Sequence, residues 1–499
     1  MHNKRVGVSQ QQGSSPHQAG RCWSRFGIVV VAVLMGLFVA FPSVGVGAVA
    51  QFTQVVIERF GIALILFSTL LVLLALGLSA SPVGRLRLGG AEAQQEFSTW
   101  SWLAMLFTAG MGSGLIFWGI AEPVFHFANP PAFVPEAARG IDHALALTYF
   151  HWGVHAWAIY ALAGLAIAWF GFGRGRSLHI SSSFTGQANK GGWRLLDWLA
   201  IIAILFGVAG TFANTIALVQ TGLQQTLSPQ IGSVGFRYGL ILLIAVLFTT
   251  SSILGLQRGI RRLSQFNALL MLVMVAVVLL WIDPWQTLTR LASSVGHYLA
   301  ILPEVSTRID PQSRQWSLDW SVIYLVWWVA WAPFVGPFIA RISRGRTVRQ
   351  FLLCVVLVPT AASLLWFSAF GGAALAQPYA PAVIEAVNQD YTQGLFRFFQ
   401  QFPLGAVLSL CAILLLITFI ITSADSALLV CGWLSDDDSH WGRLLWAALL
   451  VTLSMALLYI NDVDLNKQVA IAGALPFTLV LLAQVGMLLR DLWRTRAAR

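Results

Sequence analysis

Long apolar runs separated by short polar segments dominate the sequence. A helix needs about 20 apolar residues to cross the roughly 30 Å hydrocarbon core of a bilayer, and we count twelve runs of that kind. The predicted spans cover residues 27–46, 60–80, 101–121, 144–170, 196–222, 237–257, 266–282, 320–340, 350–371, 405–430, 443–460 and 468–489. We therefore expect an all-α integral membrane protein with twelve transmembrane helices.

Composition and charge support this prediction and add an orientation. The chain is 57% hydrophobic and only 10% charged, whereas soluble proteins have about 25% charged residues. Its Lys and Arg residues gather in alternate loops, such as 258–262 and 341–349, and in both tails. Because cytoplasmic loops carry the excess of basic residues, we expect both termini in the cytoplasm. The same placement accounts for the net charge of +10 without a nucleic-acid partner.

The polar segments also divide the chain into regions. The first apolar run is longer than a signal-peptide core of roughly 7–15 residues, so we expect an uncut first helix. Residues 283–303 have apolar positions spaced as in an amphipathic helix that lies on the outer surface. The expected regions are a cytoplasmic N-terminal tail (1–26), two peripheral transmembrane helices (27–99), a first five-helix repeat (100–282), an amphipathic extracytoplasmic linker (283–316), a second five-helix repeat (317–490) and a short basic cytoplasmic tail (491–499).

Two predicted spans contain residues that interrupt helices. The third span includes TAGMGSGLIFWG at 108–119, and the eighth includes WAPFVGP at 331–337. A glycine inside a helix costs about 1 kcal/mol relative to alanine, so such a cluster suggests a role for the backbone. Interrupted segments at corresponding positions of two halves indicate an inverted-repeat secondary transporter with a site at the membrane midplane. We expect discontinuous third and eighth helices, although close helix contacts and ordinary proline kinks are the alternative.

The fourth span carries an aromatic face. Trp152, Trp157 and Tyr160 fall within an arc of about 140° on one side of a helix. Aromatic faces attract a cation that cannot accept hydrogen bonds, and each desolvated ring contributes roughly 1 to 2 kcal/mol. A quaternary ammonium is therefore the predicted ligand, with aromatic packing against glycines as the alternative. We interpret the nearby His151 and His155 as hydrogen-bonded structural residues rather than as a metal pair.

Polar side chains also lie inside the tenth span, in the sequence FIITSADSA at 419–427. Polar groups at that depth are costly and indicate function, although Ser and Thr can bond back to their own helix. Hydroxyls opposite carbonyls released by the glycine stretch would form an oxygen cage for Na⁺. A Ser/Asp hydrolase lacks a well-placed base and an aqueous cleft here, so we do not expect an enzyme.

Four motifs together resemble the betaine/choline/carnitine transporter family (BCCT), over residues 100 to 430. They are FTAGMGSGLIFWGIAEPVFHF, FHWGVHAWAIYALAGLA, DWSVIYLVWWVAWAPFVGPFIARISRGRT and ITSADSA. The resemblance implies twelve helices with an inverted repeat of helices 3 to 7 and 8 to 12. It also implies a homotrimer among the lipids of the bacterial cytoplasmic membrane that takes up small trimethylammonium compounds.

The resemblance also assigns roles to residues. It implies an aromatic box formed by Trp152, Trp157, Tyr160 and Trp328. Trp331 would line the pathway, and Gly112 and Gly114 would let the substrate approach the main chain. The sodium site would consist of backbone oxygens of Thr108 and Met111, the carbonyl of Phe419, and the side chains of Thr422 and Ser423.

Several positions depart from the family pattern and bear on substrate and ions. Choline-type members place an aspartate where Gly114 stands, which favours a zwitterion here and hence glycine betaine over choline. VAGTFANT in the fifth span replaces the usual VATSLGLG, which leaves a second ion site, with Thr211 and Thr215 as candidates, open. We expect Na⁺-coupled uptake of glycine betaine or a related onium solute. A choline or carnitine transporter that is proton-coupled or an ion-independent exchanger is the alternative.

Overall fold

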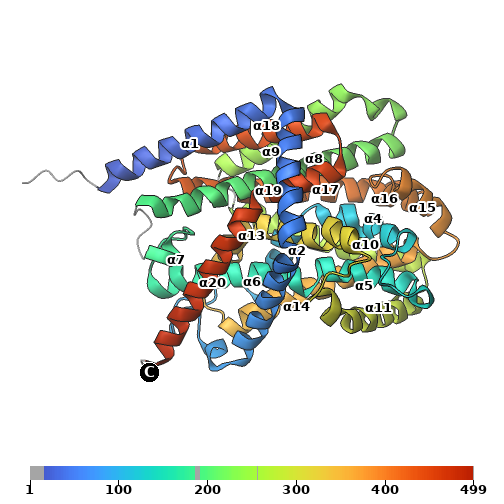
Figure 1. The fold of residues 1–499 in the computed structure, drawn as a ribbon. Coiled ribbons are helices and arrows are strands. Elements are labelled where there is room, and N and C mark those ends of the chain that lie inside the picture. The colour runs from blue at the N-terminus through green and yellow to red at the C-terminus, as the bar shows by residue number, and fades with distance from the viewer. Residues whose placement is uncertain (1–15, 186–190, 255–256, 498–499) are drawn as a thin grey trace, which may run out of the picture.

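The computed structural model describes residues 16–185, 191–254 and 257–497. In these ranges every regular element longer than an isolated bridge is a helix, as the apolar pattern predicts. The long helices pack into one bundle (Figure 1). They are α1 (Pro16–Ala40), α2 (Pro42–Ala80), α3 (Thr99–Met111), α4 (Gly114–Ala128), α5 (Ile141–Trp152), α6 (Val154–Ala168), α8 (Arg194–Thr226), α9 (Val234–Leu254), α10 (Gln257–Trp281), α11 (Pro284–Val305), α13 (Ile323–Ile342), α14 (Val348–Phe367), α17 (Gly405–Ser435), α18 (His440–Ile460), α19 (Val463–Ala472) and α20 (Ala474–Ala497). Shorter elements are α7 (Ser182–Thr185), α12 (Arg314–Trp316), α15 (Ala380–Gln389), α16 (Gly394–Phe399) and the π-helical segments η3 (Trp169–Gly173), η6 (Ser317–Val322) and η7 (Ser368–Gly372).

The outside of the bundle is apolar. In the described residues ten helices are long and apolar enough to cross a membrane, and two shorter apolar helices cover 27–38 and 114–128. Large apolar side chains project outward, for example Leu73, Val246 and Leu280, which are 62%, 63% and 82% exposed. Exposed apolar surface of this extent suits hydrocarbon rather than water. The fold is that of an integral membrane helical protein.

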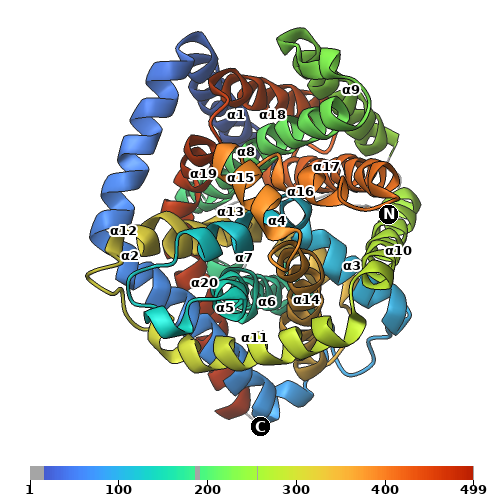
Figure 2. The ribbon, with the colours of Figure 1, turned by 90° about the vertical axis from the view of Figure 1, so that its right-hand side faces the viewer.

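The first two helices differ from the predicted spans. Helix α1 begins at Pro16, inside the predicted tail of residues 1–26, and ends at Ala40. Helix α2 then runs for 39 residues from Pro42 to Ala80, so the predicted polar connection between 46 and 60 is wrong. Pro42 suits the first turn of a helix, and the next proline, Pro82, stands just beyond the last residue of α2. Helix α2 lies along one side of the bundle (Figure 2).

The predicted interruption of the third span is confirmed, and that of the eighth is wrong. Helix α3 ends at Met111 and α4 begins at Gly114, with Gly112 between them at φ 53°. Helix α13, in contrast, continues through Pro333 and Pro337. Close packing supports it there, since a Cβ on Gly336 would lie 3.3 Å from Ala163 Cβ of α6. Neighbouring helices allow prolines to remain inside membrane helices.

The last span is also broken, where the sequence predicts a single helix over 468–489. It begins as α19 at Val463, is interrupted at Gly473 and continues as α20 to Ala497, so the predicted tail 491–499 starts inside a helix. The backbone of α8 passes very close to this point, since a Cβ on Gly473 would lie 3.0 Å from Ala203 Cα. Only glycine permits such an approach.

A helix, α11, is present where the sequence predicts one over 283–303. Asp283 caps its first turn by accepting a hydrogen bond from the Trp285 backbone N–H at 2.9 Å. Ser293 and Ser294 donate hydrogen bonds to Asp142 of α5, at 2.6 and 2.9 Å. Arg290 donates to the carbonyl of Gly372, at the end of η7, at 2.6 Å. Helix α11 therefore lies across α5 and the end of α14 (Figure 2).

Candidate functional site

A cavity lies inside the bundle at the break between α3 and α4. It is walled by α3, α4, α5, α6, α8 and α13. We call it the central cavity. Its lining consists of Gly110, Met111, Ser113, Gly114, Phe117, Trp118, Trp152, Tyr160, Thr211, Asn214, Thr215, Tyr324, Trp327, Trp328 and Trp331. Aromatic rings thus face a few small polar groups, the composition expected of a small-molecule site.

The four residues of the predicted aromatic box lie together. The ring of Trp328 on α13 is 5.3 Å from Trp152, 5.9 Å from Trp157 and 5.4 Å from Tyr160, measured between centroids. Trp328 Nε1 donates a hydrogen bond to the carbonyl of His151 at 2.9 Å, which fixes its ring against α5. Trp152, Tyr160 and Trp328 line the central cavity, whereas Trp157 lies behind them against Gly110.

The glycines of the third span make room for these rings. A Cβ on Gly110 would lie 2.6 Å from Trp157, and one on Gly114 would lie 3.1 Å from Trp152. A Cβ on Gly112 would lie 2.7 Å from Trp331, which also lines the central cavity. Both interpretations of the glycine cluster therefore describe part of the structure, because the glycines admit aromatic packing and also open the helix at the cavity.

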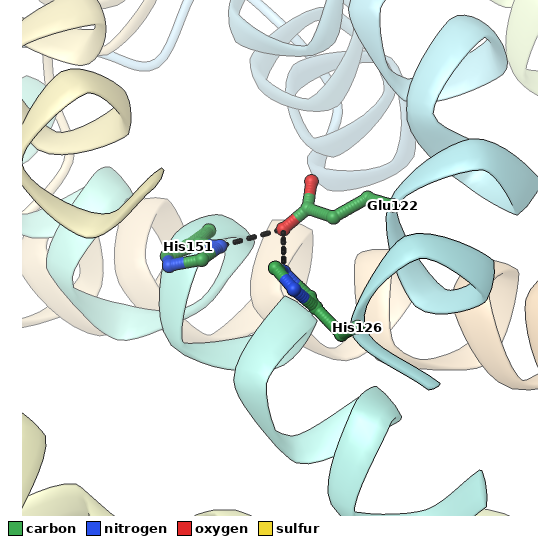
Figure 3. Close-up of side chains that lie close together, drawn as sticks. All are labelled: Glu122, His126 and His151. Atoms are coloured by element: carbon green, nitrogen blue, oxygen red, sulfur yellow. Dashed lines mark hydrogen bonds and ion pairs between the residues drawn. The ribbon is translucent and has the colours of Figure 1, made fainter. Parts of the chain in front are cut away.

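A buried carboxyl group, that of Glu122, lies between two histidines, His126 and His151 (Figure 3). Glu122 Oε1 lies 2.6 Å from His151 Nδ1 and 3.5 Å from His126 Nε2. Its Oε2 accepts a hydrogen bond from Trp152 Nε1 at 2.7 Å, and His151 Nε2 is 3.0 Å from Ser321 Oγ. The donor atoms of Glu122, His126 and His151 lie within 4.8 Å of one another, as a metal site requires. However, Glu122 and His151 already have protein partners, so the arrangement fits a hydrogen-bond network that orients Trp152.

His155 belongs to a different network. Its Nε2 lies 3.2 Å from both Ser306 Oγ and Thr69 Oγ1. His151 and His155 are thus hydrogen-bonded to separate partners, in agreement with the structural interpretation.

Some of the predicted sodium ligands meet the glycine break. Ser423 Oγ on α17 lies 3.7 Å from the Cβ position of Gly112, which brings this hydroxyl to the end of α3. Thr422 donates a hydrogen bond to the Phe419 carbonyl at 2.9 Å. Met111 is buried at the end of α3. The side chain of Thr108 lies outside the described residues.

The wall opposite the aromatic box is polar. Ser113 and Thr215 approach at 2.5 Å between their hydroxyl oxygens, and Thr215 donates to the Thr211 carbonyl at 2.7 Å. Asn214 accepts a hydrogen bond from Asn466 of α19 at 2.9 Å. Its own Nδ2 is buried without a partner among the described residues. Asn214 therefore has spare donor capacity at a wall of the cavity.

A second aromatic cluster borders both the central cavity and a pocket at one end of the bundle. Trp118 of α4, Trp320 of η6 and Tyr391 surround the ammonium of Lys467, at 5.1, 4.6 and 6.0 Å from its Nζ to the ring centroids. Lys467 also pairs with Asp464 at 2.6 Å. We call the pocket beyond them, which is lined among others by Tyr391, Asp464 and Arg237, the end pocket.

The fold and the aromatic-lined cavity define a membrane protein built around an internal small-molecule site. The family model described as BCCT, betaine/carnitine/choline family transporter, matches residues 24–497, and the chain belongs to this family. The chain is 33% identical to a glycine betaine transporter of Acinetobacter baylyi over 91% of this chain and 70% of that protein. It is 34% identical to the glycine betaine transporter OpuD of Bacillus subtilis over 96% and 95% of the two chains. A glycine betaine/proline/choline/ectoine transporter of Vibrio parahaemolyticus is 33% identical over 94% and 86%.

Proposed function

We propose that this transporter takes up glycine betaine, or a related onium zwitterion, together with Na⁺ by alternating access. The observation that carries the proposal is the aromatic box, in which Trp328 contacts three further rings beside the glycine break. A methylated ammonium cannot donate a hydrogen bond, so ring faces are its best protein partners. The names of the relatives from A. baylyi and B. subtilis point to the same solute.

The polar wall supports a zwitterion over a simple cation. The unpartnered Nδ2 of Asn214 offers hydrogen bonds that suit a carboxylate. Trp331 Nε1, which is also buried without a partner in the described part of the chain, is a further donor at the cavity. A solute with an onium group on the rings and a carboxylate toward Asn214 would satisfy both walls at once.

Na⁺ is the proposed co-substrate. The carbonyl of Phe419, the hydroxyls of Thr422 and Ser423, and backbone oxygens of Thr108 and Met111 would hold it between α17 and the end of α3. The donor set fits a hard cation because all its members are oxygens. Thr422 uses its proton on the Phe419 carbonyl, so its oxygen lone pairs remain for an ion. Binding the ion at the glycine break would couple it to the solute.

Corresponding helices support the proposed inverted repeat of twelve helices. In this arrangement spans 4 and 9 correspond, and both α6 and α14 end in a π-helical segment, η3 and η7. Spans 5 and 10 are helices of 33 and 31 residues, and spans 6 and 11 are both of 21 residues. The short apolar helices at 27–38 and 114–128 would supply the first and third spans.

The cellular setting follows from the same proposal. We place the protein in the bacterial cytoplasmic membrane with both termini inside, because its basic loops alternate. A homotrimer surrounded by lipid is the proposed assembly, and native mass spectrometry from nanodiscs tests it.

Transport in proteoliposomes tests the function directly. Radiolabelled glycine betaine uptake should require an inward Na⁺ gradient and should compete with other onium zwitterions. Uptake driven by a proton gradient alone, or counterflow that needs no sodium, would instead support the proton-coupled or exchange mechanism. No uptake or binding of any onium solute would refute the proposal.

A further inference from the structure

Lys467 is an intramolecular cation in an aromatic cage. Its ammonium faces Trp118, Trp320 and Tyr391, and only 3% of the residue is exposed. The rings also contact one another, with Trp118 at 5.9 Å from Trp320 and 5.5 Å from Tyr391 between centroids. This is the environment that the aromatic box would offer a solute, but here the occupant belongs to the chain.

The cage stands between the two cavities. Trp118 lines the central cavity, whereas Tyr391 and Asp464 line the end pocket. The rings come from elements far apart in sequence, namely α4, η6 and the segment between α15 and α16. A solute that moves between the end pocket and the central cavity along this shared wall would meet the cage and its ammonium.

We propose that Lys467 is a specificity-determining residue that selects zwitterions over simple cations on this path. The inference rests on the proposed function. An entering onium group needs the ring faces that the ammonium now covers, so the two cations compete. The ammonium that leaves the rings then needs a new partner.

A zwitterion supplies that partner and a simple cation does not. The onium group of glycine betaine takes the rings while its carboxylate pairs with the released ammonium. Choline takes the rings but adds a second positive charge beside Lys467. Among the described residues the ammonium then keeps the ion pair with Asp464, whose side chain is 57% exposed and therefore a weak partner, and the longer-range attraction of Asp319.

The test is choline competition against radiolabelled glycine betaine uptake in proteoliposomes. In Lys467→Gln we expect the choline concentration that halves betaine uptake to fall about tenfold relative to the betaine KM. This fold-change corresponds to a loss of about 1.4 kcal/mol of discrimination between the two solutes. Lys467→Arg keeps the charge and should keep the discrimination. Arg237→Gln is the matched control, because Arg237 lines the same end pocket but bonds to Gln220 and Asn461.

Asp464→Asn gives a second, independent reading and alters a mostly exposed group. It leaves a released ammonium without its carboxylate, so discrimination against choline should rise. The measured quantity is the ratio of the half-inhibitory choline concentration to the betaine KM. The inference would be overturned if this ratio were unchanged in Lys467→Gln, if it shifted equally in Arg237→Gln, or if discrimination against choline fell in Asp464→Asn. A wild-type protein that does not take up betaine would instead refute the proposed function, whatever the variants do.

Discussion

Replacing Trp328 with leucine tests the aromatic box most directly. The Trp328 ring contacts Trp152, Trp157 and Tyr160 at 5.3 to 5.9 Å and lines the central cavity. One desolvated ring contributes about 2 kcal/mol to an onium ligand, and loosening of the Trp152 edge contact adds up to about 1 kcal/mol. We therefore expect Trp328→Leu to weaken glycine betaine binding about 30- to 150-fold.

Equilibrium binding of radiolabelled betaine to purified protein measures this loss without transport. Trp328→Phe keeps a ring and loses only the hydrogen bond to the His151 carbonyl, so about a fivefold loss is expected. Trp366→Leu is the matched control, since Trp366 is buried against Gly119 and Phe370, away from the cavity. The reasoning fails if folded Trp328→Leu binds betaine with wild-type affinity.

Further predictions concern the ion, the buried carboxyl group and pH. Thr422→Ala with Ser423→Ala should raise the sodium concentration for half-maximal uptake more than tenfold, because each hydroxyl bonded to an ion is worth about 1.5 to 3 kcal/mol. An unaltered sodium curve would argue against this site. Glu122→Gln should weaken betaine binding roughly tenfold, since a neutral acceptor holds the Trp152 indole less firmly than a carboxylate; unchanged affinity would contradict that role. Burial alone would raise the pKa of Asp436, but His179 and Arg194 outweigh it and hold this pKa below its usual value of 3.8. A lowered pKa stabilises the fold above the unfolded-state value and loses that effect as pH falls through the folded one. Asp436→Asn should therefore lower the free energy of unfolding at pH 7 by about 1 kcal/mol or less, since the side chain is 36% exposed, and the difference from wild type should shrink as the pH falls below 3.8. A deficit in melting temperature that does not shrink at acid pH would exclude the ion pairs as its cause.

Much of the site could be predicted because its parts follow local rules. Glycine is costly inside a helix, so the break at Gly112 is visible in the sequence. The spacing of Trp152, Trp157 and Tyr160 predicts one face of a single helix. The three rings do lie close to Trp328, but the helix breaks at Gly153, so Trp152 ends α5 and the other two lie on α6. That Trp328 joins them depends on packing between distant segments, and only the family resemblance supplied it.

The predictions that are wrong concern helix continuity, which depends on packing with residues that are distant in the sequence. Pro333 and Pro337 look like helix breakers, yet tight contact with α6 keeps α13 continuous. Gly473 lies in an unremarkable apolar run, and its break reflects the approach of α8, which no local pattern announces.

The functional candidates that sequence reasoning missed are single polar residues in apolar surroundings. Glu122 lies in GIAEPVFHF, and Lys467 lies in DLNKQVA. Both are ionisable residues next to apolar runs, and ionisable residues inside a membrane are rare and indicate function. Lys467 lies one residue before the predicted last span, 468–489, so the apolar pattern alone does not place it inside the membrane. Their partners, Trp152 and the ring cage, lie too far away in sequence to be inferred.

The hydrogen bonds of α11 constrain how the bundle can rearrange. This helix holds α5 through Asp142 and η7 through the Gly372 carbonyl. Helix α11 thus links two spans that correspond in the proposed repeat, so these two spans must move together. In the described part of the chain the helices of the bundle are discontinuous at Gly112, Gly153 and Gly473, so hinge motion can arise at these joints while α11 holds α5 and η7 together.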